Sequence, residues 1–352
     1  MRQGGSKTAL MGTLLSLVVS GSALAEMCYD RSVQGHRLVV DSHLHFQPFS
    51  GPHIDHQVMV DYLQRAGIKY ANVYGIGQTR IQDWACLNGG DCSGNAVIAP
   101  TMKNDFVNGV NMNAYPRTGV ELRASMTFPD LQNPEGIVDR MAILDREFPG
   151  LFQWMGEANL VKQALFSYGH EAATLDDIAN WAPFMERLAE RNMPLALHSD
   201  MGNDEDDYGY VHLMEAVLEQ YPDNTVVWMH LGTSREQMEL DPQEHVAEMS
   251  RLMDTYPNLW FDISWNVLYD GYFRDADRRE HYVGFLNQYA SRILTGTDLV
   301  ASSYTSYNDY LRALEQNSFI NQYLDKRAFR YIALGQSYFD LLDIDDVAPP
   351  VC

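Results

Sequence analysis

The feature that most constrains the fold is an alternation of short apolar runs with longer amphipathic stretches. The runs are rich in β-branched or aromatic residues, as strands are, and their starts lie roughly 30 to 50 residues apart, the length of one strand-helix unit. We expect eight strands, at Leu38-Val40, Tyr70-Tyr74, Leu122-Phe128, Phe152-Met155, Leu195-Leu197, Thr225-Met229, Leu259-Ile263 and Ile293-Thr295.

The intervals between these runs carry helix signals. Asn133-Pro134 begins one amphipathic stretch and Asp241-Pro242 begins another. Eight successive strand-helix units predict an α/β fold with one domain, the (β/α)8 TIM barrel, because helices must cover a parallel sheet. The widest interval, between residues 74 and 122, predicts a loop insertion after strand 2. A doubly wound open sheet is the alternative.

The first residues have the pattern of a secretory signal peptide. Arg2 and Lys7 precede an apolar run over residues 9–19, and Ala23-Leu24-Ala25 supplies the small residues that a signal peptidase recognises. We expect residues 1–25 to be removed on export, residues 26–352 to form the barrel, and the mature protein to be periplasmic or secreted. A buried N-terminal helix is the alternative. No later stretch reaches the roughly 18 apolar residues of a membrane-spanning helix, so we expect no membrane anchor.

Export makes the four cysteines candidates for disulfide bonds. Cys86 and Cys92 flank a short, turn-rich loop. Cys28 and Cys352 lie at the two ends of the mature chain, and the termini of a domain are often close together. We therefore expect the pairs Cys86 with Cys92 and Cys28 with Cys352, which would leave no thiol to act as a nucleophile.

The charge of the chain excludes one class of partner. The sequence has 25 Lys and Arg against 47 Asp and Glu, a formal net charge of −22, so phosphate backbones would be repelled. We expect a small-molecule substrate and no nucleic acid, and the oligomeric state stays open.

Side chains that could bind a metal stand at the ends of five of the predicted strands. In a barrel the carboxyl ends of the strands meet around one mouth, where the active site lies. Imidazole and carboxylate groups suit Zn, Mn or Fe. We therefore expect a divalent metal site, with zinc as the first choice, one or two ions, and ligands from His43, His45, Glu157, His198, His230 and Asp298.

This set of residues resembles the amidohydrolase superfamily of metal-dependent hydrolases. The matching pattern is His43-x-His45 after strand 1, then His198, His230 and Asp298 after strands 5, 6 and 8. It looks most like the amidohydrolase-related branch, also called amidohydrolase 2. The ending Ile332-Ala333-Leu334-Gly335-Gln336-Ser337 is similar to the closing helix of that branch. The resemblance covers essentially the whole mature chain and says little about substrate.

The resemblance also implies a role for each residue. His43, His45 and Asp298 would hold the first metal, and His198 would join that ion or bind a second one. His230 would bind a second metal or, without one, polarise the substrate carbonyl. Many members bridge two metals with a carboxylated lysine on strand 4.

At that position this chain has Gly156-Glu157, which the deoxyribonuclease-like branch shares. The resemblance therefore makes Glu157 a bridging ligand. The alternative is that Glu157 only orients a neighbour or contacts the substrate. Lys162 lies past the predicted strand end and is a poor candidate for carboxylation.

Three functions follow from these residues. The first is a hydrolase that attacks the C=O of an amide, ester or lactone with metal-activated water, with Asp298 as the base and His230 as a second catalytic residue. The second is a metal-dependent non-oxidative decarboxylase or hydratase, in which Arg235 could hold a carboxylate. The third is a periplasmic binding protein without catalytic activity, which the complete ligand set disfavours.

Residues around the expected site carry weaker signals. Asp41 could hold a histidine N–H or cap the barrel rim. The acidic stretch from Asp200 to Asp207 indicates either a preference for neutral or cationic substrates, an extra Ca²⁺, or simply a solvated loop. Four aromatic residues after strand 7 could line a pocket or pack against the rim, namely Trp265, Tyr269, Tyr272 and Phe273.

Overall fold

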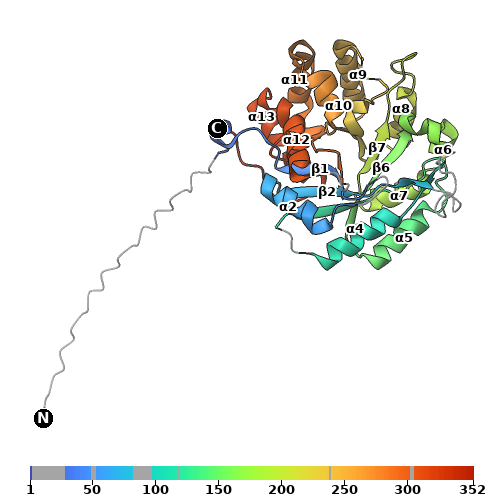
Figure 1. Cartoon of the computed structure of the whole chain (residues 1–352), viewed down its shortest axis with the longest axis horizontal. Helices are drawn as coiled ribbons and strands as arrows, with labels where there is room; N and C mark the ends of the chain where they lie inside the picture. Colours follow the sequence, from blue (N-terminus) through green and yellow to red (C-terminus); the bar gives the residue numbers. More distant parts are fainter. Residues whose placement is uncertain (2–27, 49–52, 82–96, 117–118, 238, 302–304) are drawn as a thin grey trace.

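The structure, a computed structural model, describes residues 1, 28–48, 53–81, 97–116, 119–237, 239–301 and 305–352 (Figure 1). The predicted signal peptide and the predicted pair Cys86 with Cys92 lie outside the described residues and stay predictions. In the part that is described, every helix is too short or too polar to cross a bilayer.

A nine-stranded parallel sheet forms the centre of the protein, in the order β10-β9-β8-β7-β6-β5-β2-β1-β11. All eight predicted runs fall on it. Its strands are β1 (Val40–His45), β2 (Tyr70–Tyr74), β5 (Glu121–Met126), β6 (Phe152–Val161), β7 (Leu195–Ser199), β8 (Val226–Trp228), β9 (Leu259–Asp262), β10 (Ile293–Leu294) and β11 (Leu299–Val300).

The two ends of this sheet are joined by the short segment 295–298 between β10 and β11. The amide of Ser42 donates to the Thr295 carbonyl at 3.0 Å, and the amide of Asp298 donates to the His43 carbonyl at 2.8 Å. β10 pairs with β9 and β11 pairs with β1, so this stretch of chain lies between the first and seventh predicted strands. The sheet is thus curled into a TIM-barrel-like arrangement, which favours the barrel over an open doubly wound sheet.

Helices surround the curled sheet, with α2, α4 and α5 on one side and α9 and α11 on the other (Figure 1). Local capping explains where several of them begin. Asp241, for example, accepts from the amides of Gln243 and Glu244 and precedes Pro242 at the first helical position of α9. The helices are α1 (Arg31–Gln34), α2 (His56–Ala66), α4 (Lys103–Ala114), α5 (Ile137–Glu147), α6 (Leu175–Ala179), α7 (Ala182–Glu190), α8 (Val211–Gln220), α9 (Pro242–Thr255), α10 (Asn266–Leu268), α11 (Ala276–Tyr289), α12 (Tyr307–Ser318), α13 (Lys326–Ile332) and α14 (Gln336–Leu341).

Two details differ from the sequence expectation. The first strand begins at Val40 and runs to His45, because its polar residues are buried inside the curled sheet and break the apolar pattern that marks a strand. In the predicted insertion after β2, the strands β3 (Gln78–Ile81) and β4 (Val97–Pro100) form an antiparallel pair.

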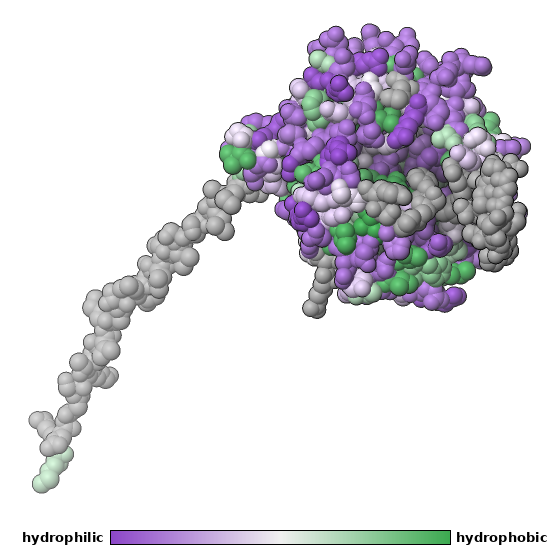
Figure 2. Space-filling view, viewed as in Figure 1, coloured by the Kyte–Doolittle hydropathy of each residue, from purple (hydrophilic) through white to green (hydrophobic). Residues whose placement is uncertain are grey.

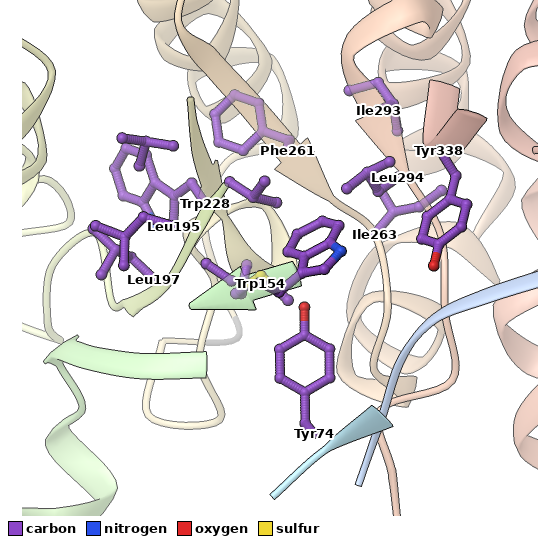
Figure 3. Packing of buried hydrophobic residues seen from close by; sticks show 14 of the residues in the cluster. Tyr74, Trp154, Leu195, Leu197, Trp228, Phe261, Ile263, Ile293, Leu294 and Tyr338 are labelled. Carbon is purple, nitrogen blue, oxygen red and sulfur yellow. The ribbon is translucent and has the colours of Figure 1, made fainter. Parts of the chain in front are cut away.

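The core lies within the sheet and between the sheet and its helices. Trp154, Trp228 and Phe261 are fully buried there, and the Trp228 indole N–H donates to the Ser199 carbonyl at 2.7 Å (Figure 3). Tyr74 points toward Trp154 in this cluster, and its ring lies 4.6 Å from the His43 ring. The apolar core therefore supports the first of the expected metal ligands.

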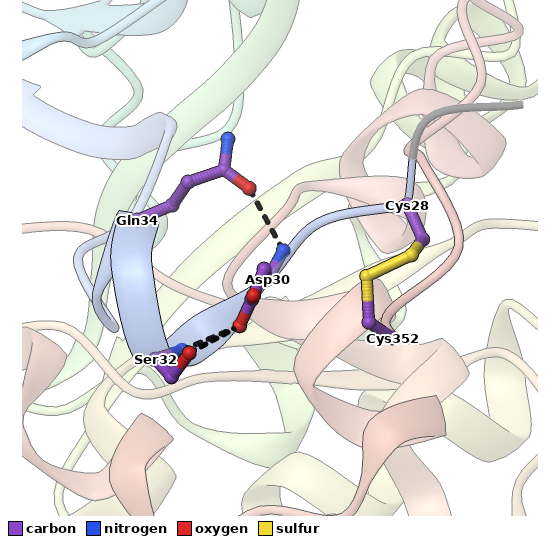
Figure 4. The surroundings of a disulfide bond; sticks show 5 residues. All are labelled: Cys28, Asp30, Ser32, Gln34 and Cys352. Atoms are coloured by element: carbon purple, nitrogen blue, oxygen red, sulfur yellow. Dashed lines mark hydrogen bonds between the residues drawn. A yellow bond between two sulfur atoms is a disulfide. The ribbon is translucent and has the colours of Figure 1, made fainter.

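A disulfide ties the start of the folded part to the C-terminus. Cys28 and Cys352 form a disulfide with their Cα atoms 5.2 Å apart, which confirms the predicted pair (Figure 4). The amide of Tyr29 donates to the Pro350 carbonyl and the amide of Cys352 donates to the Tyr29 carbonyl, at 2.7 and 3.0 Å. On the face seen in Figure 2 hydrophilic residues predominate, as expected for a chain of this charge.

Candidate metal centre

The first two candidate ligands come from β1. His43 and His45 are two residues apart in an extended strand, so both side chains point to the same side. Their Nε2 atoms lie 3.1 Å apart, and both residues are almost completely buried. One end of the site is therefore set by a simple alternation that the sequence already predicted.

Glu157 lies inside β6, where the strand bulges against β7. Met155 pairs with Leu195 and Ala158 pairs with Leu197, so β6 has one residue more than its partner over this interval. Gly156 allows the bulge, because its φ is +105° and a Cβ there would meet the Ala196 carbonyl oxygen.

The bulge leaves the Glu157 carboxylate between two pairs of histidines. Its Oε2 lies 3.8 Å from Nε2 of His43 and 3.5 Å from Nε2 of His45. Its Oε1 lies 2.6 Å from Nδ1 of His198 and 3.6 Å from Nε2 of His230. Each oxygen therefore faces a different histidine pair.

Of the remaining ligands, His198 lies on β7 and the other two stand on unusual backbone. His230 and Asp298 both have positive φ, at +57° and +50°. Leu231 and Trp265 next to the site share this conformation, so four of the six non-glycine residues with positive φ in the described chain are at the site. Such conformations cost energy and cluster at functional sites.

All six predicted ligands converge. Asp298 Oδ1 lies 3.5 Å from His43 Nε2 and 3.2 Å from His45 Nε2. Among the described residues, three overlapping groups have ligand atoms within 4.8 Å of one another, and they are His43, His45 and Glu157; His43, His230 and Asp298; and Glu157, His198 and His230.

The outer nitrogen of each histidine ring has its own partner. His45 Nδ1 lies 2.6 Å from the Gly75 carbonyl, and His198 Nε2 lies 3.2 Å from the Asp200 carboxylate. His43 Nδ1 lies 2.9 Å from Ser264 Oγ, and His230 Nδ1 lies 3.2 Å from the Ser264 carbonyl. A partner on the outer nitrogen leaves the inner nitrogen free to donate its lone pair to a cation.

Ser264 and Asp262 are parts of the site that sequence reasoning missed. The Ser264 hydroxyl lies against His43 and His230 together and donates to Asp262 Oδ1, which also accepts from the Ser264 amide at 3.0 Å. The signal was present as the polar residues Asp262 and Ser264 at the end of the seventh strand. Without the fold, nothing connected Ser264 to His230, 34 residues away, or to His43, 221 residues away.

Nearby cationic and hydrogen-bonding groups keep both carboxylates of the cluster ionised. Burial raises the pKa of Glu157, but the charge of Lys162 and the hydrogen bond from His198 outweigh it and hold this pKa well below its ordinary value. Lys162 Nζ lies 3.6 Å from Glu157 Oε1. Burial also raises the pKa of Asp298, yet His43 and His45 lower it to about 2. Both carboxylates are therefore ionised at neutral pH.

The same carboxylates act on the histidines. Burial lowers the pKa of His45, but the hydrogen bonds to Asp298 and Glu157 raise it to about 9. The pKa of His230 is raised as well, against the effect of burial, chiefly by Glu157. The cluster thus favours positive charge between its carboxylates, supplied by protons or by a cation.

Asp41 does not hold a histidine ring. This buried carboxylate accepts from the Thr297 amide and hydroxyl, both at 2.8 Å, and from the Tyr310 hydroxyl at 3.0 Å. Burial raises its pKa to about 7. Thr297 is on the segment that carries Asp298 and Tyr310 is on α12, so Asp41 ties that segment to α12.

A cavity of about 460 Å³ opens above the cluster and is lined by His45, Glu157, His198, His230 and Asp298. Of the aromatic residues expected there, Trp265 lines the cavity. Tyr272 and Phe273 are buried instead, packed against Tyr282, and Tyr269 packs against Phe319.

The acidic stretch combines one buried carboxylate with exposed ones, and the exposed ones agree with the expectation of a solvated loop. Asp200 is buried and accepts from the Gln163 amide at 2.8 Å while facing His198. None of residues 204–207 lines the cavity. Exposed carboxylates of this loop therefore do not form the wall that a substrate would meet.

Comparisons with solved structures agree with the fold. An amidohydrolase from Burkholderia multivorans with bound Zn matches at 13% identity, over 87% of this chain and 99% of that chain, with a TM-score of 0.52. A dihydroorotase from Campylobacter jejuni matches at 12% identity, over 88% and 84%, with a TM-score of 0.51. A dihydroorotase from Saccharomyces cerevisiae in complex with 5-fluoroorotic acid matches at 11% identity, over 88% and 85%, with a TM-score of 0.50. At these identities the likeness establishes the fold alone.

Sequence comparison gives the family. No curated protein matches this chain. The model of the amidohydrolase family Amidohydro_2 matches residues 116–333, a span that contains Glu157, His198, His230 and Asp298. More than half of the chain is covered, and the sequence resemblance is thereby confirmed. The chain belongs to the amidohydrolase family.

Proposed function

We propose that this chain is a metal-dependent hydrolase that uses activated water to attack the C=O of an amide, ester or lactone. The observation that carries the proposal is the position of Glu157, whose two oxygens face His43 with His45 and His198 with His230. A carboxylate in this position can bridge two cations, one on each side.

The donor set suits divalent metals. Four imidazoles and two ionised carboxylates converge, and the outer nitrogen of every imidazole is occupied. We propose that His43, His45 and Asp298 hold one ion, that His198 and His230 hold the other, and that Glu157 joins both. Zinc is our first choice, as in the similar Burkholderia amidohydrolase, with Mn or Fe as alternatives.

When bound, divalent ions of this kind lower the pKa of a coordinated water molecule and polarise a carbonyl group. Asp298 is the base in this proposal, because its Oδ1 lies beside both β1 histidines and its low pKa keeps it ionised at neutral pH. It accepts the proton of the attacking water and transfers it to the leaving group. His230 faces the same cavity from the other side of Glu157, and it would orient the substrate carbonyl in place of its role as a ligand if only one ion is bound.

Metal content tests the proposal. We expect about two zinc ions per chain in the purified protein, about one in Glu157→Ala, and almost none in His43→Ala, measured by elemental analysis. Glu239→Ala, which changes an exposed glutamate, is the matched control and should keep the full content. A parent protein that binds no zinc, manganese or iron would contradict the proposal.

A second candidate is non-oxidative decarboxylation, favoured by Lys162 and Arg235 in the cavity wall, where they could hold a carboxylate. This reaction needs no water nucleophile. One ion per chain that is unaffected by Glu157→Ala but lost in His43→Ala would favour it over the hydrolase.

The setting of the enzyme is also part of the proposal. We propose that residues 1–25 direct export, that residues 26–352 form one barrel domain, and that the mature protein acts outside the cytoplasm on a small molecule. Amino-terminal sequencing of the mature protein should then begin at Glu26. A sequence that begins at Met1 would contradict the export proposal.

A further inference from the structure

The cavity wall contains three cationic side chains besides the metal-binding residues, Lys162, Arg235 and Arg312. Two of them have carboxylate partners within the protein. Lys162 lies 3.6 Å from Glu157, and Arg312 lies 3.2 Å from Asp309 on α12. No ion pair among the described residues includes Arg235, although the protein as a whole is strongly acidic.

Arg235 is held by an aromatic ring instead. Its Cζ lies 5.3 Å from the centroid of the Trp265 ring, within the range of a cation–π contact. A stacked guanidinium keeps its N–H edge available for a carboxylate, which it can bind through two parallel hydrogen bonds.

The indole of Trp265 connects this cation to the metal-binding residues. The ring lies 4.9 Å from the His230 ring and 6.2 Å from the His198 ring. The positive φ of Trp265, +83°, shows that the backbone adopts a costly conformation where this ring faces the cavity. His230 and Arg235 therefore both lie next to the same indole.

The carboxylates in the cavity wall form no ion pair with Arg235 in the described part of the chain. Glu157 and Asp298 face the histidines, and Asp309 faces Arg312. Glu236 is the remaining carboxylate in the wall and lies next to Arg235 in the chain, exposed to solvent.

We propose that the substrate carries a carboxylate that binds Arg235 and a planar group that packs on Trp265. This inference rests on the proposed function, since it places the reacting carbonyl at the metal-binding residues next to the same indole. A cavity of about 460 Å³ suits a molecule of this size class. Arg235 is thus a specificity residue for small organic acids.

Benzoate and benzamide provide a matched pair of probes, because they share a planar ring and differ in charge. We would titrate each into the zinc-loaded protein by calorimetry. The parent should bind benzoate about tenfold more tightly than benzamide. Arg235→Met should abolish that preference and leave benzamide binding unchanged. Trp265→Leu should weaken both probes, and benzoate more than benzamide, because the indole also holds Arg235.

Arg65→Met is the control, since Arg65 also lies over an aromatic ring, Tyr307, but outside the cavity. It should keep the preference for benzoate. Equal affinities in the parent, no binding of either probe, or a preference that survives in Arg235→Met would overturn the inference, the last because the carboxylate would then bind elsewhere.

Zinc content of the same samples separates this inference from the proposed function. Zinc-loaded protein without a preference for benzoate contradicts the carboxylate site alone. Protein that binds no metal but still prefers benzoate through Arg235 contradicts the hydrolase proposal and supports the carboxylate site.

Discussion

Glu157 Oε1 lies 2.6 Å from Nδ1 of His198, while the other oxygen of the same carboxylate faces the β1 histidines. This contact depends on a bulge in β6 that adds one residue opposite β7. A single side chain thereby links the histidines of β1 with His198 on β7 and His230 after β8.

Asp298→Asn should remove the base while preserving the shape of the side chain. We expect kcat of the metal-loaded enzyme to fall roughly 10²- to 10⁴-fold, because the amide cannot accept the proton of water. Turnover at saturating metal, together with circular dichroism, measures the effect. Full activity in a folded variant would exclude Asp298 as the base.

Ser264→Ala should weaken metal binding without unfolding the protein. The hydroxyl orients His43 and contacts His230, and loss of such an outer partner typically costs about 10- to 100-fold in metal affinity. Competition with a chelator measures the dissociation constant. Ser250→Ala is the control, because the Ser250 hydroxyl donates to the Val246 carbonyl within α9. Equal affinities in the two variants would assign Ser264 a purely structural role.

His245 should make stability depend on pH. The side chain is buried between the Tyr282 hydroxyl and the Leu231 carbonyl, and burial lowers its pKa from 6.5 to about 4. Between these values the unfolded state binds the proton and the folded state does not. Stability from this group is therefore complete above pH 6.5 and lost as pH falls toward 4, by up to about 1.4 kcal/mol per pH unit.

Urea unfolding of His245→Gln at several pH values tests this expectation. The variant should show a shallower loss of unfolding free energy between pH 6.5 and pH 4 than the parent. His212→Gln, at an exposed position on α8, should follow the parent. Parallel curves for the parent and His245→Gln would mean that His245 is not neutral in the folded state.

The Cys28–Cys352 disulfide should stabilise the fold without touching the metal site. It joins two residues that are 324 positions apart in the sequence, and such a cross-link contributes about 2–4 kcal/mol. Cys28→Ser with Cys352→Ser should lower the unfolding free energy by that amount, measured with urea, and retain the metal content of the parent. Unchanged stability would show that the backbone pairing of Tyr29 and Val351 suffices.

Much of the site was visible in the sequence because it depends on local rules. Alternation in an extended strand predicts that His43 and His45 point the same way, and strand ends in a barrel predict which other residues join them. The boundaries of β1 were less visible, because its residues from Asp41 to His45 include four polar side chains that are buried within the sheet.

The contacts between distant segments were not predictable in this way. Asp41 was a candidate partner for a histidine, but its carboxylate accepts hydrogen bonds from Thr297, 256 residues away. Ser264 and Asp262 looked like ordinary polar residues at a strand end. Of the four aromatic candidates, Tyr272 is buried in the core and Trp265 lines the cavity, and this difference depends on packing.

The sequence by itself determined the order of strands and helices, the acidic charge and the identities of the six candidate ligands, because these follow from composition and short-range periodicity. Tertiary structure alone decided which oxygen of Glu157 faces which histidine pair and which arginine is left with an indole as its partner. Such relationships depend on a bulge, a few residues with positive φ, and side chains that meet across hundreds of residues, and no local pattern encodes those distances.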